Sequence, residues 1–78
     1  MRKKEMKLVI TFHTTADAMA LEKYCRDNGL LGRLIPVPRT ISAGCGMAWC
    51  TDEEMEGVFS RLLNEHDISS DGIYHCLI

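Results

Sequence analysis

A cysteine between two glycines is the residue of this chain whose setting best suits chemistry. Cys45 lies between Gly44 and Gly46, a few residues after the rigid Pro-Val-Pro segment 36–38. Glycine has no Cβ and readily adopts positive φ angles, so flanking glycines let a ligand or another protein approach the thiol closely. The pattern predicts that Cys45 is displayed on a loop as a reactive thiol. The alternative is a glycine-rich hairpin in which the thiol only packs.

The chemistry open to such a thiol is that of its thiolate, which attacks sulfur or selenium and binds soft metals. The other cysteines are Cys25, Cys50 and Cys76, and no C-x-x-C pair occurs, which argues against a thioredoxin motif or a zinc ribbon. These three are expected to be free thiols that pack as small buried hydrophobic residues.

Length and composition narrow the function classes. The 78 residues are enough for a single domain over residues 1–78 with one modest core. A formal net charge of −2 argues against nucleic-acid binding, which needs a clustered basic face. The apolar run 8–10 is too short for a signal-peptide core or a membrane span, so a cytoplasmic protein is expected. Phosphate loops, dinucleotide fingerprints and paired carboxylates are missing from the sequence, so neither a cofactor, a bound metal nor catalytic turnover is expected.

Hydrophobic patterns predict four strands and two helices. A β-branched apolar run marks a central strand, Pro36 marks an edge strand, and Thr14 or Thr15 can cap the first helix, which Gly29 ends. The expected strands cover residues 7–12, 32–37, 47–51 and 73–78, and the expected helices run from about 16 to 27 and onward from residues 51–52.

The strongest periodic signal is an apolar stripe in the second helix, with the spacing i, i+3, i+4, i+7, i+8. We expect it to pack on the sheet against Leu8 or Val9, Ile10 and Leu34. The stripe consists of Met55, Val58, Phe59, Leu62 and Leu63. Trp49 is expected to pack in the core or on a face of the sheet.

The order β-α-β-β-α-β favours an α+β, ferredoxin-like split βαβ fold. Two helices would cover one face of a four-stranded antiparallel sheet in the order 4-1-3-2, and a mixed sheet is the main alternative. In the ferredoxin-like order, the turn 13–15, the connection 38–46 and the connection 69–72 emerge at one end of the sheet.

Cys45 would then lie near a helix N-terminus, near His13 and within reach of Arg39, each of which lowers the pKa of a thiol. The residues expected to surround the thiol are His13, Thr14, Thr15, Arg39, Gly44 and Gly46. For His13 the alternative is an ordinary surface turn residue, and for Arg39 a solvated side chain.

Three segments carry a resemblance to a known family. They are Phe-His-Thr-Thr-Ala-Asp-Ala-Met-Ala at 12–20, Gly-Arg-Leu-Ile-Pro-Val-Pro-Arg at 32–39 and Ile-Ser-Ala-Gly-Cys-Gly-Met-Ala at 41–48. Over nearly its whole length the chain resembles the selenium/sulfur carrier protein-like family, formerly a domain of unknown function. The resemblance implies a role in selenium or sulfur trafficking, with Cys45 as the carrier thiol that holds a persulfide or perselenide. A cysteine desulfurase or a selenium-metabolism enzyme would be the partner.

Two other functions remain open. The chain could be a small protein-interaction or regulatory domain without carrier chemistry. It could also be a soft-metal chaperone that uses Cys45, Cys50 and His13, although their spacing matches no common ligand signature. A homodimer through an exposed sheet face or edge is compatible with each of these functions.

Overall fold

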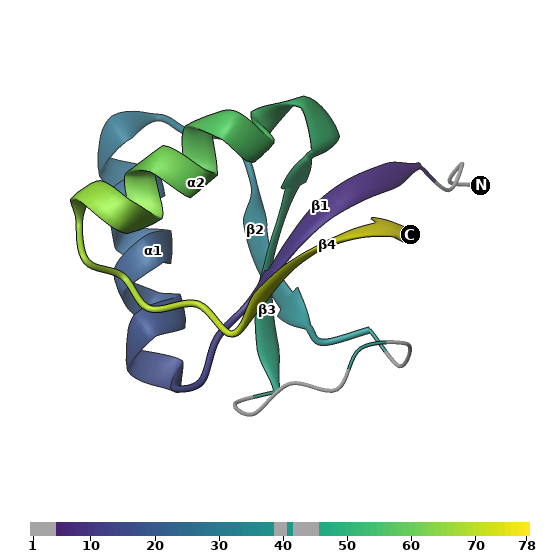
Figure 1. The fold of residues 1–78 in the computed structure, drawn as a ribbon, viewed down its shortest axis with the longest axis horizontal. Helices are drawn as coiled ribbons and strands as arrows, with labels where there is room; N and C mark the ends of the chain where they lie inside the picture. The colour runs from purple at the N-terminus through teal and green to yellow at the C-terminus, as the bar shows by residue number, and fades with distance from the viewer. Residues whose placement is uncertain (1–4, 39–40, 42–45) are drawn as a thin grey trace.

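The computed structural model describes residues 5–38, 41 and 46–78. Within them the chain forms strand β1 (Met6–Thr11), helix α1 (Thr15–Asn28), strands β2 (Arg33–Pro36) and β3 (Met47–Asp52), a short 3-10 turn η1 (Glu53–Met55), helix α2 (Glu56–Glu65) and strand β4 (Gly72–Leu77) (Figure 1). This is the predicted order β-α-β-β-α-β.

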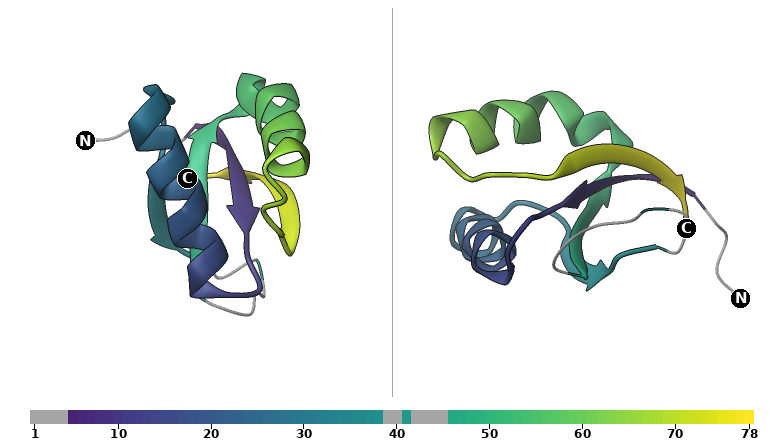
Figure 2. Two further views of the ribbon diagram at one scale, coloured as in Figure 1. Left: turned by 90° about the vertical axis from the view of Figure 1, so that its left-hand side faces the viewer. Right: turned by 60° about the horizontal axis from the view of Figure 1, so that its bottom comes forward.

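The four strands form one antiparallel sheet in the order β2-β3-β1-β4. Counted from the other edge, this is the predicted order 4-1-3-2, so the ferredoxin-like fold is confirmed and the mixed sheet is excluded. Both helices lie on the same face of the sheet (Figure 2). The short strand β2, which ends at Pro36, lies at one edge as expected, and β4 forms the other.

Strand β1 is central because it pairs with both β3 and β4. Its side chains alternate between the two faces of the sheet. Leu8 and Ile10 are fully buried under the helices, and Val9 is equally buried on the opposite face. We expected either Leu8 or Val9 to pack against the second helix, and Leu8 is the one that lies on the helix-covered face.

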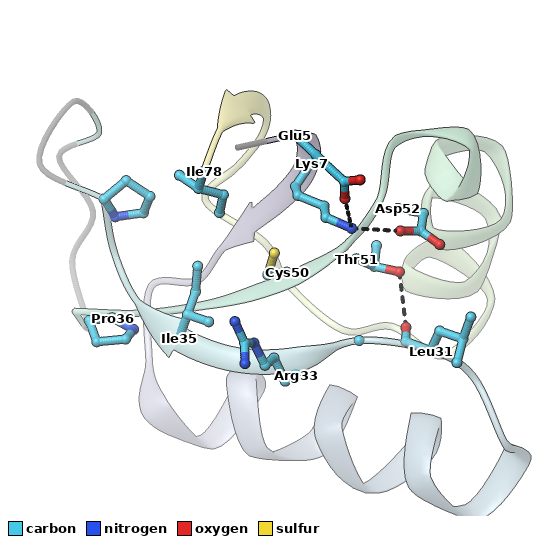
Figure 3. Close-up of a pocket in the computed structure, with 12 residues that line it drawn as sticks. Glu5, Lys7, Leu31, Arg33, Ile35, Pro36, Cys50, Thr51, Asp52 and Ile78 are labelled. Carbon is cyan, nitrogen blue, oxygen red and sulfur yellow. Dashed lines mark hydrogen bonds and ion pairs between the residues drawn. The ribbon is translucent and has the colours of Figure 1, made fainter. Parts of the chain in front are cut away.

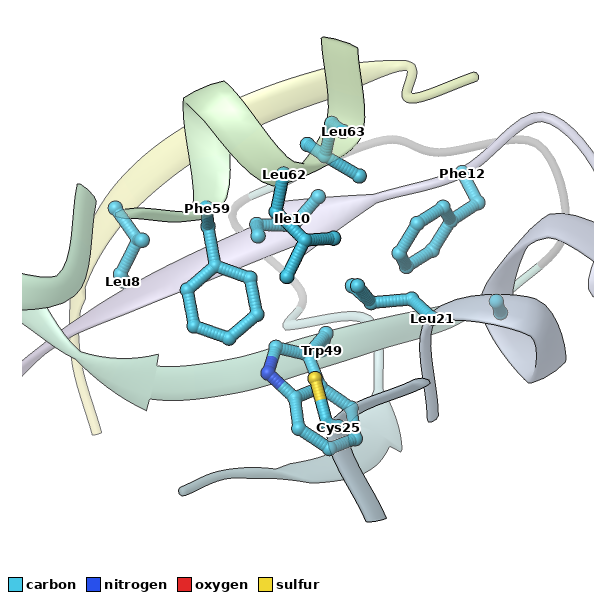
Figure 4. Packing of buried hydrophobic residues seen from close by; sticks show 10 residues of the cluster. Leu8, Ile10, Phe12, Leu21, Cys25, Trp49, Phe59, Leu62 and Leu63 are labelled. Carbon is cyan, nitrogen blue, oxygen red and sulfur yellow. The ribbon is translucent and has the colours of Figure 1, made fainter. Parts of the chain in front are cut away.

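The core cluster consists of Leu8, Ile10, Phe12, Ala18, Leu21, Cys25, Trp49, Phe59, Leu62 and Leu63 (Figure 4). Trp49 is 3% exposed, as predicted, and Leu34 packs against this cluster.

Helix α1 has the predicted caps at both ends. The Thr14 hydroxyl accepts a hydrogen bond from the Asp17 backbone N–H at 3.2 Å, which satisfies a free donor of the first turn. Gly29 adopts a left-handed conformation (φ +69°) and its N–H donates to the Cys25 carbonyl. These caps fix where the helix begins relative to the end of β1.

The second helix begins later than the sequence suggests. We expected it to start at Thr51 and Asp52, but β3 continues through Asp52 and α2 begins only at Glu56, after η1. The Thr51 hydroxyl donates to the Leu31 carbonyl at 2.9 Å and holds that residue in the sheet. A contact between segments 20 residues apart therefore outweighs the helix-favouring run of acidic residues.

The apolar stripe of α2 is also narrower than predicted. Phe59, Leu62 and Leu63 are buried, and Met55 packs against the core at its margin. Val58 is 47% exposed, so its predicted burial is wrong. It lies about 100° around the helix from Phe59, beyond the arc that meets the sheet.

Candidate functional site

Three elements begin at one end of the sheet, the end at which β1 finishes. Thr11, the last residue of β1, is paired with Ala48 near the start of β3 and with Gly72 at the start of β4. The beginnings of α1, β3 and β4 therefore lie at this end. This is the convergence that the ferredoxin-like order predicts.

His13 and the cap of α1 define the described part of this end. The His13 Nε2 atom lies 3.4 Å from Asp71 Oδ1, and the Asp71 backbone N–H donates to the Thr11 carbonyl at 2.7 Å. Thr14 caps the helix and Thr15 is its first residue. The partial positive charge of a helix N-terminus thus lies at this end, together with an imidazole whose side chain is 61% exposed.

Gly46 shows why a glycine follows the cysteine. Its φ is +78°, in the region that L-residues with a side chain rarely adopt, while a Cβ built there would meet nothing within 4 Å. The need for glycine is therefore conformational, not a matter of space. The Gly46 carbonyl also accepts a hydrogen bond from the Val37 N–H at 3.1 Å, which continues the β2–β3 pairing by one step.

Three of the predicted site residues, Arg39, Gly44 and Cys45, lie outside the described residues. The proximity of Cys45 to His13 and to the start of α1 therefore stays a prediction. Of the predicted set, His13, Thr14, Thr15 and Gly46 are described, and each lies next to or at the sheet end named above.

The three described thiols are poor candidates for thiolate chemistry. Cys25 is fully buried in the core, and burial raises its pKa to about 11. Burial also raises the pKa of Cys50, against the opposing positive charges of Lys7 and Arg33. Cys76 is only partly buried, so its predicted full burial is wrong, but desolvation still raises its pKa. Thiols with raised pKa values are mostly protonated and unreactive at neutral pH.

A cavity of about 920 Å³ lies on the sheet face opposite the helices (Figure 3). Alternation along the strands brings Lys7, Arg33, Ile35 and Cys50 to this face, because their neighbours point into the core. The remaining lining residues are Glu5, Leu31, Gly32, Pro36, Pro38, Thr51, Asp52 and Ile78. Sequence patterns give no sign of this cavity, since its lining comes from four segments of the chain that only the sheet brings together.

The charges around the cavity are unevenly distributed. The Lys7 ammonium contacts Asp52 at 2.9 Å and Glu5 at 3.2 Å, so one side holds two carboxylates and one cation. The hydrogen bond that Lys7 donates to Asp52 is the main reason that the pKa of Lys7 is raised. Cys50 lies between Lys7 and Arg33 (Figure 3), and among the described residues no ion pair is formed by Arg33. The cavity is thus lined by charged side chains on one side and by apolar side chains, such as Ile35 and Ile78, on the other.

His75 forms a second charged cluster that the sequence did not suggest. Its Nδ1 lies 2.8 Å from Glu53 Oε2 and its Nε2 lies 3.2 Å from Glu56 Oε1. The hydrogen bond to Glu53 is the largest cause of a raised His75 pKa. His75 is about 20 positions from each glutamate in the chain. Only the fold, which brings η1 and the start of α2 next to β4, reveals the contact.

Residues 5–38, 41 and 46–78 contain no group of three or more His, Cys, Asp or Glu side chains arranged to hold a metal ion. The proposed metal set of Cys45, Cys50 and His13 is not tested by this, because Cys45 lies outside those residues. Neither helix in the described part of the chain is long and apolar enough to cross a membrane.

Comparison with known proteins identifies relatives of this chain. A curated relative, the uncharacterized protein YtiA of Escherichia coli (strain K12), is 27% identical over 75 residues, which cover 91% of this chain and 88% of YtiA. No solved structure matches the chain. Residues 7–75 match the family described as "Putative Se/S carrier protein-like", and the match spans every strand and both helices apart from the ends of β1 and β4. The chain therefore belongs to this selenium/sulfur carrier protein-like family.

Proposed function

We propose that this protein is a sulfur or selenium carrier that holds a persulfide or perselenide on Cys45. The observation that carries the proposal is the state of the other three thiols: burial raises the pKa of Cys25, of Cys50 and of Cys76. A carrier needs a thiolate at cytosolic pH, so Cys45 is the cysteine left for the role. Membership in the family independently favours a carrier.

The surroundings of the Cys45 segment support the same assignment. Gly46 holds a positive φ, and the helix N-terminus of α1 and His13 lie at the end of the sheet where β3 begins. A helix N-terminus and a nearby imidazolium both stabilise a thiolate. We propose that Thr14, Thr15, His13 and Arg39, the last of which lies outside the described residues, provide this stabilisation. We also propose that Gly44 and Gly46 leave room for a donor enzyme.

The transfer step follows from thiolate chemistry. The Cys45 thiolate attacks the terminal sulfur of a donor persulfide, R–S–SH, and forms the S–S bond of Cys45–S–SH while R–S⁻ leaves. A perselenide reacts in the same way through its terminal selenium. We propose that the donor is a cysteine desulfurase or a selenium-metabolism enzyme of the cytoplasm, and that the carrier itself turns nothing over.

Intact-mass spectrometry tests this proposal. The protein is incubated with a cysteine desulfurase and cysteine, and the expected product carries one additional sulfur atom, mapped to Cys45. Cys45→Ser should abolish the mass increase. The control is Cys76→Ser, because among the described thiols Cys76 is the one that is not fully buried; this variant should retain the mass increase. Loading of Cys76 instead would contradict the assignment of the carrier thiol to Cys45. No loading at all by either sulfur or selenium donors would favour an interaction module without carrier chemistry.

A further inference from the structure

The outer edge of β4 carries backbone N–H and C=O groups that no other strand pairs within the described residues. Ile78 and Glu5 exchange both of their backbone hydrogen bonds, at 3.0 Å each. Because such pairs alternate along an antiparallel ladder, Cys76 and Tyr74 also bond to β1, while every second residue of β4 points its N–H and C=O away from it. The outward residues are Ile73, His75 and Leu77, which present three N–H and three C=O groups.

The two edges of the sheet differ in how they are guarded. Natural edge strands are commonly short or carry proline and charged side chains that prevent pairing with another chain. β2 is four residues long, starts at Arg33 and ends at Pro36. β4 has six residues without proline, lysine or arginine, and within the described residues no strand lies beyond it. The β4 edge therefore lacks the features that keep a strand from pairing.

Exposed apolar side chains border this same edge. Leu77 is 58% exposed, Tyr74 38% and Ile78 39%, and Met6 on the neighbouring strand is 45% exposed. Met6 is paired with Leu77 in the ladder, so the two side chains lie next to each other on one face. A partner that adds a strand to β4 would cover both the open hydrogen-bonding groups and this apolar strip.

We propose that the β4 edge is a homodimer interface, at which the β4 strands of two copies pair antiparallel about a twofold axis at His75. In this register Ile73 of each copy faces Leu77 of the other, and His75 faces its own counterpart. All three outward residues are then engaged, whereas a shift by two residues leaves one outward residue of each copy unpaired. The register is thus the one that satisfies the whole edge with identical strands.

The side chains suit a second copy in this register. The pair formed by Ile73 and Leu77 is apolar on both sides, and Tyr74 falls opposite Cys76 on the other face. The cationic form of His75 is already compensated within its own chain, since Glu53 and Glu56 contact its two ring nitrogens. The two His75 side chains that face each other in the dimer therefore each have a counter-ion. The dimer forms a continuous eight-stranded sheet with all helices on one face.

Light scattering across a concentration series tests the interface. The wild type is expected to reach twice its 8.8 kDa chain mass. Leu77→Lys should shift the protein to monomer, because a lysine at a β edge opposes pairing. Met19→Lys is the matched control: Met19 on α1 is also 58% exposed, so this variant should remain dimeric. Leu77→Pro should also be monomeric yet folded, because its missing N–H points away from β1.

Cysteine cross-linking tests the register. Residues in a non-hydrogen-bonded antiparallel pair have Cα atoms about 4.5 Å apart and side chains close enough for a disulfide, and in this register Tyr74 of one copy forms such a pair with Cys76 of the other. Tyr74→Cys should therefore form a disulfide-linked dimer through residues 74 and 76 under mild oxidation, and Ile73→Cys should not link to itself. A wild type that is monomeric at all concentrations, a dimer unaffected by Leu77→Lys, or a link at residue 73 would overturn the proposal. Sulfur loading of Cys45 does not depend on these outcomes, so the two proposals fail separately.

Discussion

The central packing contact between α2 and the sheet can be tested by removing Phe59. Its side chain is fully buried, and its ring centroid lies 6.4 Å from that of Trp49 at an interplanar angle of 40°. Truncation of a fully buried Phe to Ala costs about 3–5 kcal/mol through lost burial and the cavity left behind. At roughly 0.05–0.15 kcal/mol per residue, the whole domain has a free energy of unfolding of only about 4–12 kcal/mol. Phe59→Ala should therefore remove a large part of the stability.

The neighbouring residue supplies the control. Val58 is 47% exposed on the same helix, so Val58→Ala should change the free energy of unfolding by no more than about 0.5 kcal/mol. In a domain of this size, 1 kcal/mol corresponds to about 4–8 °C in Tm. Thermal unfolding followed by circular dichroism should thus show a fall of at least about 12 °C for Phe59→Ala and of less than about 4 °C for Val58→Ala.

Two outcomes would refute this account of α2. An unchanged Tm in Phe59→Ala would mean that the residue is not in the core. Equal damage from Val58→Ala would mean that the helix is rotated from the position in the structure. If Phe59→Ala does not fold, Phe59→Leu preserves part of the buried volume and should give a smaller loss of Tm, still greater than that of Val58→Ala.

Substitutions at four further positions test local features. Gly32→Ala should cost more than about 2 kcal/mol, because φ is +136° and a Cβ would lie 2.6 Å from the Trp49 ring; Gly57→Ala in α2, where a Cβ meets nothing within 4 Å, should instead stabilise the protein by about 0.5–1 kcal/mol in urea unfolding. Thr14→Ala should cost about 1 kcal/mol through loss of the helix cap, and Thr14→Ser should cost less. Because its glutamate partners raise the pKa of His75, its stabilising contribution is present below the ordinary histidine pKa of about 6.5 and is lost as the pH rises through the raised value. The difference in Tm between wild type and His75→Gln should therefore be greater at about pH 6 than at about pH 9, and a pH-independent difference would contradict the ion pairs.

Local signals in the sequence were sufficient for most of the fold. The β-branched run of β1, the threonine cap and the Gly29 terminator are short-range features, and each predicts its element regardless of the remaining chain. Together with the order of the elements, they led to the correct strand order. The errors occurred where a long-range contact decides: the Thr51 hydrogen bond to the Leu31 carbonyl prolongs β3, and the angle at which α2 meets the sheet exposes Val58.

The candidate site was predictable only in part. Helix and turn positions follow from the strand order, so the location of His13, Thr14 and Thr15 at one end of the sheet could be predicted from the sequence. The cavity around Cys50 and the contact of His75 with two glutamates could not, because each requires residues from strands and helices that are remote in the chain. Partial exposure of Cys76 also escaped prediction, since it depends on the position of β4 at the sheet edge.

The central claim is that Cys45 is the reactive thiol and that the other three cysteines serve the structure. Competitive alkylation of the folded protein with a limiting reagent, followed by peptide mapping over a pH series, measures this for all four thiols at once. Cys45 should be labelled first, with a midpoint below the pKa of about 8.5 of an ordinary thiol, while Cys25, with its pKa of about 11, should react only after unfolding. Preferential labelling of Cys50 or Cys76, or a Cys45 midpoint at or above that of an ordinary thiol, would contradict the claim.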